Sequence, residues 1–274
     1  MAWHITDSVD EFLAGAGDFL RARPVENTVL LTVTDTVRQR GPRAYGDGPP
    51  VFGWRGDGAF VRTPPRGALL SEMPPAAAAE LAVSLAGTDL PGVAAPDAVA
   101  EAFAAEWQRL TGVIGKVVGR QRLYRLGSLT PPDPAAPGAG RIAEARDRDL
   151  LIDWMTAFQR ELGEDPQATA EFVDDKLSYG GMLLWEDAGQ PVSMAGISRA
   201  AAGMVRVMAV YTPREHRARG YAGAATTAVT RAALDAGVTD VVLFADHSNP
   251  TSNALYQRLG YTPIEDRQTV EFPS

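Results

Sequence analysis

The run Arg217-Ala218-Arg219-Gly220-Tyr221-Ala222-Gly223 combines the residue types and the spacing that bind phosphate groups. Gly220 and Gly223 allow backbone turns that few other residues tolerate, and their missing side chains let a ligand approach the main chain. A helix that begins here directs its unpaired N–H groups and the positive end of its dipole at phosphate oxygens. We therefore predict a pyrophosphate cradle at residues 217–223. A surface loop that caps a helix is the alternative.

Neither common nucleotide-binding fingerprint is present in the chain. A P-loop ends in Gly-Lys-Ser/Thr, but the only two lysines are Lys116 and Lys176. A dinucleotide-binding fold requires Gly-x-Gly-x-x-Gly directly after its first strand, with an acidic residue about 20 positions further on. The spacing of the cradle therefore indicates a different phosphate ligand.

The residues around the cradle predict the elements that hold it. Residues 204–211 mix β-branched and apolar side chains, as a buried strand does, and Thr212-Pro213 ends them. Residues 222–236 carry small apolar side chains at helical spacing up to Gly237, which predicts a helix packed on a sheet. Residues 241–245 form a short apolar run typical of a central strand. The predicted order is strand, phosphate loop, helix, strand.

A second motif follows, in which Asn249, Asn253 and Tyr256 precede the pair Gly260-Tyr261. A capping Asn, a Pro at the first helical position and a Gly after the end predict a short helix here. The cradle has the form Arg/Gln-x-x-Gly-x-Gly/Ala, which resembles the acetyl-coenzyme A pyrophosphate loop of the GNAT family of N-acetyltransferases. The second motif resembles the other coenzyme A motif of that family. The resemblance covers roughly residues 139 to 270.

The resemblance implies an α+β (mixed α/β) fold, a GNAT-like mixed sheet flanked by helices, with acetyl-coenzyme A as cosubstrate. In this family the fourth and fifth strands splay apart and expose backbone groups to the acetyl-pantetheine arm. Carried over by position, Val210 faces the thioester and its N–H polarises the carbonyl, while Tyr211 and Thr212 contact the arm. The pyrophosphate is bound by main-chain N–H groups from Arg217, Ala218, Arg219, Gly220, Tyr221, Ala222 and Gly223. The side chains of Arg217 and Arg219 either add charge or are solvated.

Tyr256 is the candidate acid that protonates the departing thiolate. A phenol has an ordinary pKa of about 10, so it carries the required proton at neutral pH. The alternative is a core aromatic residue that uses its hydroxyl as a polar handle. Asn253 and Asn249 are candidate contacts of the coenzyme, although a helix cap explains Asn249 equally well.

The general base and the acceptor site are less defined. Asp246 and His247 follow the fifth strand and either face the splay or form a turn; a relayed water is a further candidate base. Acidic residues crowd the two helices that roof the acceptor site in this family, and they predict attraction of a cationic amine or else form a solvated face. They are Glu161, Glu164, Asp165, Glu171, Asp174 and Asp175. We take Glu171, Asp174 and Asp246 as candidate acceptor-binding residues.

The proline-rich segment 129–138 predicts an interdomain linker, because it is too stiff for a helix and lacks donors for a sheet. It separates a half at 1–128 from a catalytic half at 139–274. The first half shows strand and helix patterns in an order parallel to the second, with helices near residues 9–21, 76–85 and 97–110, an apolar segment at 28–37, and two strand-like runs before Leu126. It has no cradle. We predict two tandem GNAT-like domains, the first degenerate; an unrelated α+β cap is the alternative.

The composition of the chain excludes several kinds of site and of binding partner. The chain has 274 residues, no cysteine and a net charge of −8, so disulfides, thiolate metal sites and a covalent acyl-cysteine are excluded and nonspecific nucleic-acid binding is disfavoured. Its start lacks a signal-peptide pattern, and no apolar stretch reaches the length of about 18 residues that spans a bilayer. We expect a cytoplasmic protein without a metal cofactor, a nucleic-acid partner or a membrane partner. A homodimer stays open.

These features predict an acetyl-coenzyme A-dependent N-acetyltransferase that transfers the acetyl group to a primary amine of a small cationic molecule. The amine attacks the thioester directly in a ternary complex. Two alternatives remain. One is a noncatalytic acetyl-coenzyme A-binding regulatory module. The other is a tandem enzyme similar to mycothiol synthase, since tandem domains alone do not select a substrate.

Overall fold

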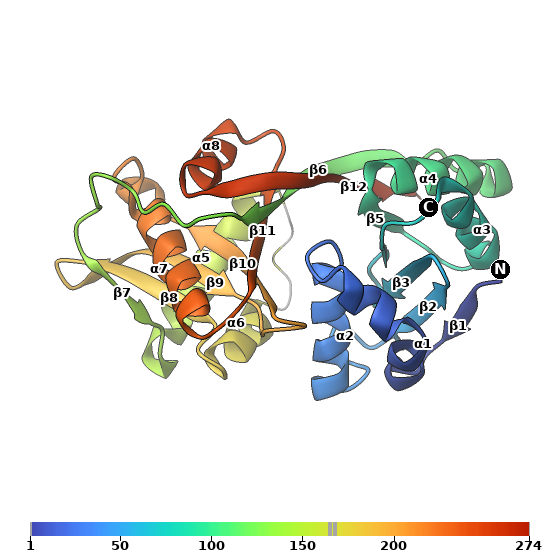
Figure 1. The fold of residues 1–274 in the computed structure, drawn as a ribbon, viewed down its shortest axis with the longest axis horizontal. Coiled ribbons are helices and arrows are strands. Elements are labelled where there is room, and N and C mark those ends of the chain that lie inside the picture. The colour runs from blue at the N-terminus through green and yellow to red at the C-terminus, as the bar shows by residue number, and fades with distance from the viewer. Residues whose placement is uncertain (1, 164–165, 167–168, 274) are drawn as a thin grey trace. The chain divides into compact units, whose positions relative to one another are not determined.

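The computed structural model describes residues 2–163, 166 and 169–273, and these form two compact units (Figure 1). The first unit comprises residues 2–123, 245–249 and 263–273 of the described chain. The second comprises residues 124–244 and 250–262, less the undescribed positions. No helix among the described residues is both long enough and apolar enough to cross a membrane.

The first unit is a sheet with a pair of helices on each face. Strands β1 (His4–Thr6), β2 (Val51–Arg55), β3 (Gly58–Arg62) and β4 (Ala68–Leu70) pair antiparallel in chain order. β4 then pairs in parallel with β5 (Gly92–Pro96). Figure 1 shows helices α1 (Val9–Ala22) and α2 (Thr28–Arg40) on one face, and α3 (Pro75–Leu85) and α4 (Asp97–Thr111) on the other.

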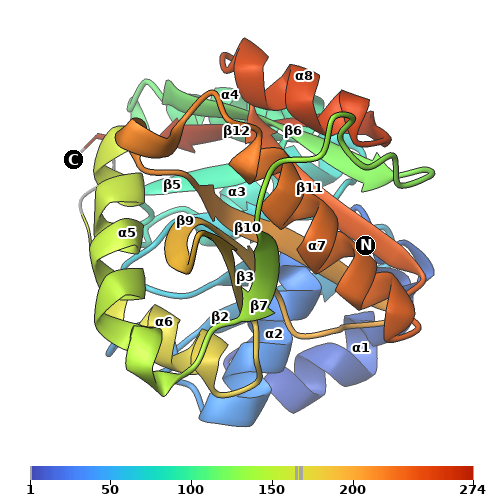
Figure 2. The ribbon, with the colours of Figure 1, turned by 90° about the vertical axis from the view of Figure 1, so that its left-hand side faces the viewer.

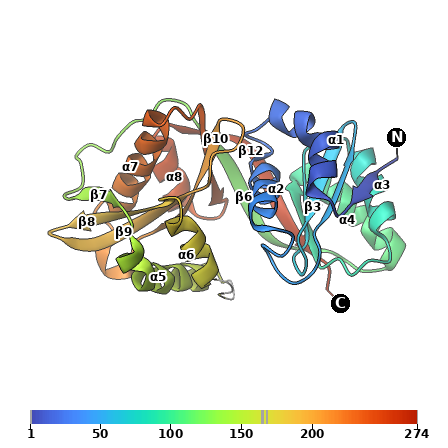
Figure 3. The ribbon, with the colours of Figure 1, turned by 90° about the horizontal axis from the view of Figure 1, so that it is seen from below.

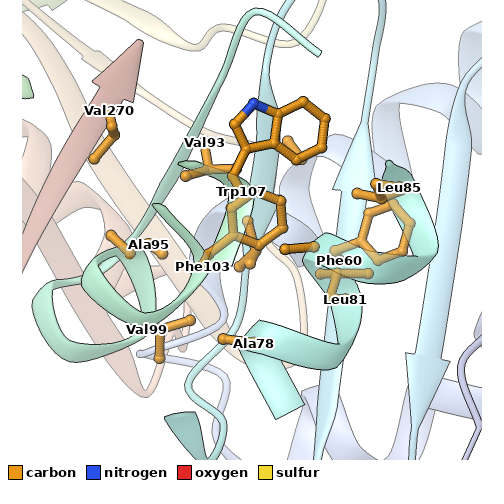
Figure 4. Packing of buried hydrophobic residues seen from close by; sticks show 14 of the residues in the cluster. Phe60, Ala78, Leu81, Leu85, Val93, Ala95, Val99, Phe103, Trp107 and Val270 are labelled. Carbon is orange, nitrogen blue, oxygen red and sulfur yellow. The ribbon is translucent and has the colours of Figure 1, made fainter. Parts of the chain in front are cut away.

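The main core of this unit lies between the sheet and helices α3 and α4 (Figure 4). Phe60 from β3, Leu81 from α3 and Phe103 from α4 are fully buried there. The Trp107 ring stacks on Phe272 at 5.2 Å between centroids, so the end of the chain completes the core of the first unit. Burying aromatic side chains of this size contributes strongly to the stability of such a core.

The second unit repeats the same order of elements. Its strands lie in the order β11 (Asp240–Asp246), β10 (Met204–Tyr211), β9 (Gln190–Ile197), β8 (Met182–Asp187) and β7 (Ala139–Ile142). Only the β10–β11 pair among these is parallel. Helices α5 (Arg148–Glu161) and α6 (Thr169–Leu177) cover one face, and α7 (Tyr221–Asp235) and α8 (Pro250–Arg258) cover the other (Figure 3).

Two strands contribute residues to both units. β6 (Lys116–Leu126) begins in the first unit and ends in the second, and β12 (Tyr261–Glu271) runs the other way. Residues Arg267–Glu271 of β12 pair antiparallel with Gly92–Pro96 of β5. The compact units therefore differ from the halves at 1–128 and 139–274 that the sequence predicts, because the last strand of the second half completes the sheet of the first.

Most predicted elements of the first half are present, with one difference in the strand-like runs before Leu126. The apolar segment at residues 28–37 forms helix α2, whose buried face includes Leu30, Val33 and Val37. These apolar side chains recur at helical spacing, and the threonines between them donate hydroxyl hydrogen bonds back to the helix backbone. The two strand-like runs before Leu126 form a single strand, β6.

Candidate functional site

Strands β10 and β11 separate beside Val210. In the described chain, β10 pairs with β11 only over Met204–Val207, whereas β10 continues to Tyr211. The pairing of β10 with β9 shifts register between Met208 and Tyr211, and Ala209 there has a φ of 51°. Such a bulge bends a strand and exposes its backbone groups. The edge of β10 around Val210 therefore has no pairing with β11 among the described residues, as a splayed strand pair requires.

The cradle connects β10 to helix α7. After a short turn at Arg214–His216, Ala218 and Gly220 adopt left-handed conformations with φ of 61° and 80°, and α7 begins at Tyr221. The first helical hydrogen bond runs from Ala224 N–H to Gly220 O. Among the described residues, the amides at positions 221–223 have no backbone acceptor, as expected for a first helical turn. The local geometry thus presents free donors and the positive end of a dipole.

Two side chains of the cradle hold it in place. Arg217 Nε donates to Thr212 O at 2.8 Å, and its Nη2 lies 2.6 Å from Glu161 Oε2 at the end of α5. The buried Tyr221 donates its hydroxyl to Asp187 Oδ2 of β8. The Arg217 side chain is therefore not simply solvated, because it is bound to Thr212 and Glu161. The anchoring role of Tyr221 has no signal in the sequence motif, because its partner comes from a distant strand.

Tyr256 of α8 lies in a cluster of buried tyrosines. Its ring is 6.4 Å from that of Tyr124 and 6.2 Å from that of Tyr261, measured between centroids. Burial raises the pKa of Tyr256 to about 12. The hydroxyl therefore keeps its proton throughout the working pH range, although a higher pKa makes it a weaker acid. This environment is compatible with both sequence interpretations of Tyr256, the acid and the core aromatic.

Tyr124 is a residue that the motif analysis missed. It is fully buried in β6, and its hydroxyl donates to Asn253 Oδ1 at 2.6 Å. This bond fixes one end of the Asn253 amide, a candidate coenzyme contact. The strand that supplies Tyr124 is far from the motifs in sequence, so only the fold reveals the connection.

Asp246, His247 and Asn249 form a turn that belongs by its contacts to the first unit. Asp246 Oδ1 accepts hydrogen bonds from the N–H and the hydroxyl of Ser248, each at 2.7 Å. Asn249 N–H donates to Asp246 O, and His247 Nε2 lies 3.1 Å from Arg122 Nη2. These bonds describe a turn-forming role for Asp246.

The acidic roof is largely neutralised by arginines. Asp174 pairs with Arg148 through two contacts of 2.6 and 2.9 Å, and these hydrogen bonds lower the pKa of Asp174. Glu161 pairs with Arg214 and Arg217, and Asp175 pairs with Arg199. In the part of the chain that the structure describes, Glu171 has no ion pair within 4.0 Å, although its charge contributes to the raised pKa of Arg148. Glu164 and Asp165 lie outside the described residues.

Comparison with known proteins agrees with this geometry. Residues 143–261 match the sequence model of the acetyltransferase (GNAT) family. No curated protein matches the chain significantly. Among solved structures, a GCN5-related N-acetyltransferase from Sphaerobacter thermophilus is 15% identical with a TM-score of 0.65, covering 99% of this chain and 96% of that one. One from Kribbella flavida is 18% identical with a TM-score of 0.60, covering 89% and 96%.

A tandem GNAT protein from the clavulanic acid biosynthesis pathway is also similar. It is 15% identical, with a TM-score of 0.55 and 99% of each chain covered. At these identities the structures establish a shared fold. The described chain thus has a tandem arrangement of the fold, with the sequence match confined to its second half.

Proposed function

We propose that the protein, whose residues 143–261 match the acetyltransferase (GNAT) family, transfers the acetyl group of acetyl-coenzyme A to a primary amine of a small molecule. The observation that carries the proposal is the position of the splayed β10 edge directly before the cradle. The edge offers backbone groups to a thioester, and the cradle offers amides to a diphosphate. Only the turn at Arg214–His216 and the residues beside it separate the two features in the chain, which favours a single bound molecule that spans both.

The residues of this matched segment supply what thioester aminolysis needs. The Val210 N–H polarises the thioester carbonyl and stabilises the developing oxyanion. Tyr256 donates its hydroxyl proton to the leaving thiolate, and the proton that the attacking amine nitrogen loses returns through water to the Tyr256 oxygen. Tyr211, Thr212 and Asn253 position the pantetheine arm. The amine attacks directly in a ternary complex, and the absence of cysteine excludes an acyl-cysteine intermediate.

The first unit lacks these features. Only four residues separate β4 from α3, and they contain no glycine. β4 precedes α3 as β10 precedes α7, yet its end is covered: the buried Arg267 donates from Nη2 to Leu70 O at 2.7 Å and from Nη1 to Glu26 O. We therefore propose that only the second unit binds the coenzyme and that the first is a degenerate repeat.

Turnover with a panel of primary amines tests the proposed function. Free thiol should be released in equal amounts with an acetylated amine, and release should depend on the amine. Coenzyme binding without amine-dependent thiol release would instead indicate a noncatalytic module. Activity restricted to a thiol-bearing amino sugar would indicate the alternative similar to mycothiol synthase.

Charge on α6 tests whether the acceptor is cationic. Asp174 is paired, so we expect Glu171 to provide most of the attraction. Glu171→Lys should raise the KM for a cationic amine by about two- to five-fold at low ionic strength, because an exposed charge interaction is worth roughly 0.2–1 kcal/mol. The KM for acetyl-coenzyme A should not change, and added salt should reduce the effect. Steady-state kinetics measure both constants.

The matched control is Asp235→Lys, an equal charge change at the exposed end of α7. Asp174→Lys and Asp246→Lys complete the series for the other two candidate acceptor residues. If Glu171→Lys leaves the amine KM at the wild-type value in low salt, α6 is an ordinary solvated face and the acceptor is not selected by charge there.

A further inference from the structure

The proline-rich segment 129–138 follows a defined path across the second unit. At its start, Gly127 N–H donates to Gly260 O and Thr130 N–H donates to Leu259 O, just after α8. At its end, the Trp185 indole N–H of β8 donates to Pro137 O at 2.8 Å. Between these anchors the segment passes between α8 and α7 (Figures 1 and 2). We call residues 129–138 the strap.

The strap fills space beside both glycines of the cradle. A methyl group added to Gly223 would lie 3.3 Å from Pro132 Cγ and 3.2 Å from Leu255 Cδ1. One added to Gly220 would lie 3.5 Å from Ala136 Cβ. A methyl group at Gly220 would therefore be in ordinary van der Waals contact with Ala136, whereas the absent side chain of Gly223 makes room for the strap and for Leu255. This contact also explains why Gly223 is buried although it lies in the first turn of α7.

The strap lies beside the cradle, but in the described chain it does not accept hydrogen bonds from the cradle amides. The groups that approach the glycines are the Pro132 ring and the Ala136 methyl, which are apolar. Among the described residues, no strap carbonyl accepts a backbone hydrogen bond from positions 221–223. Those amides stay available for a phosphate, so the strap is a side wall of the cradle and leaves its donors uncovered.

We propose that the strap is part of the coenzyme site, forming its wall on the side of α8, with bound coenzyme A in contact with Pro132 and Ala136. The inference rests on the proposed function, because it takes the cradle as the site of the diphosphate. The two anchored ends and the proline content hold the strap in place before the coenzyme arrives. A wall that is already ordered costs less conformational entropy on binding.

Variants of the strap separate contact from general flexibility. Pro132→Ala removes part of the ring that faces the cradle and should raise the Kd for coenzyme A by about three- to ten-fold, since burying one methylene is worth about 0.8 kcal/mol. Pro131→Ala is the matched control, because the neighbouring Pro131 is exposed. Ala136→Gly and its exposed neighbour Ala135→Gly form a second pair. Calorimetry gives each Kd.

Hydrogen exchange of the wild-type protein supplies an independent readout. Coenzyme A should slow exchange at the amides of Ala135, Ala136 and Gly138. Two results would refute the proposal that the strap contacts the coenzyme, provided that the wild type binds coenzyme A. One is that Pro132→Ala binds coenzyme A equally well. The other is that hydrogen exchange at the strap amides is unchanged or faster when coenzyme A is bound. If the wild type binds no coenzyme A, the proposed function itself fails.

Discussion

Replacement of Gly220 by Val is expected to abolish measurable coenzyme A binding. Gly220 has a φ of 80°, a left-handed conformation that costs an ordinary residue about 1–2 kcal/mol and a β-branched residue more. Val would therefore rotate this peptide and misalign the amides of the first turn of α7. Each hydrogen bond to a charged phosphate contributes about 1.5–3 kcal/mol, so losing two weakens binding by at least about a hundred-fold.

Gly237→Val is the matched control for this prediction. Gly237 also has a positive φ, 84°, and follows the opposite end of α7, where an added side chain meets open space. It should lower the melting temperature by a similar amount and leave the Kd for coenzyme A unchanged. Calorimetric titration measures the Kd of each folded variant for coenzyme A. If Gly220→Val bound coenzyme A with the wild-type Kd, the coenzyme would not use the cradle.

Tyr256→Phe is expected to lower kcat by on the order of 10–10³-fold, near the range for a positioned general acid, with little change in coenzyme A affinity. Only the hydroxyl is removed, so the packing against Tyr124 and Tyr261 is retained. Because burial raises the pKa of Tyr256 to about 12, the group stays protonated at lower pH. The wild-type kcat should therefore show no loss from this acid up to about pH 10.

Tyr261→Phe provides the comparison, since it removes a hydroxyl from the same aromatic cluster. The Tyr261 hydroxyl lies 2.6 Å from Thr230 Oγ1 in the core, so its loss should lower stability more than kcat. Pre-steady-state kinetics show whether the chemical step limits kcat in each protein. Equal kcat values for wild type and Tyr256→Phe, with the chemical step limiting in both, would make Tyr256 a core aromatic residue.

Local sequence signals predicted the elements around the site well. The strand at 204–211 has the predicted bounds, and α7 and α8 lie within one or two residues of theirs. These elements have strong local determinants: a continuous apolar strand, glycine and proline at helix ends, and small residues at helical spacing. The predicted splay at Val210 has a structural counterpart in the bulge at Ala209, a departure that propensity does not signal.

Long-range features were beyond the sequence. The Arg148–Asp174 and Arg217–Glu161 pairs join residues from separate elements, and charge counting along the chain gives no sign of them. The pairing of β12 with β5 and the path of the strap depend on tertiary contacts between distant segments. Periodicity identifies which face of an element is buried, but it does not identify the partner that covers it.

We expect one coenzyme site per chain, built by the second unit, to serve acetyl transfer. Calorimetric titration of the wild-type protein with coenzyme A tests this expectation most directly. We expect a stoichiometry of one coenzyme per chain, because the cradle occurs once and Arg267 covers the end of β4 in the first unit. A stoichiometry of two would contradict it by showing that the first unit also binds, and no binding would contradict the assignment of the cradle itself.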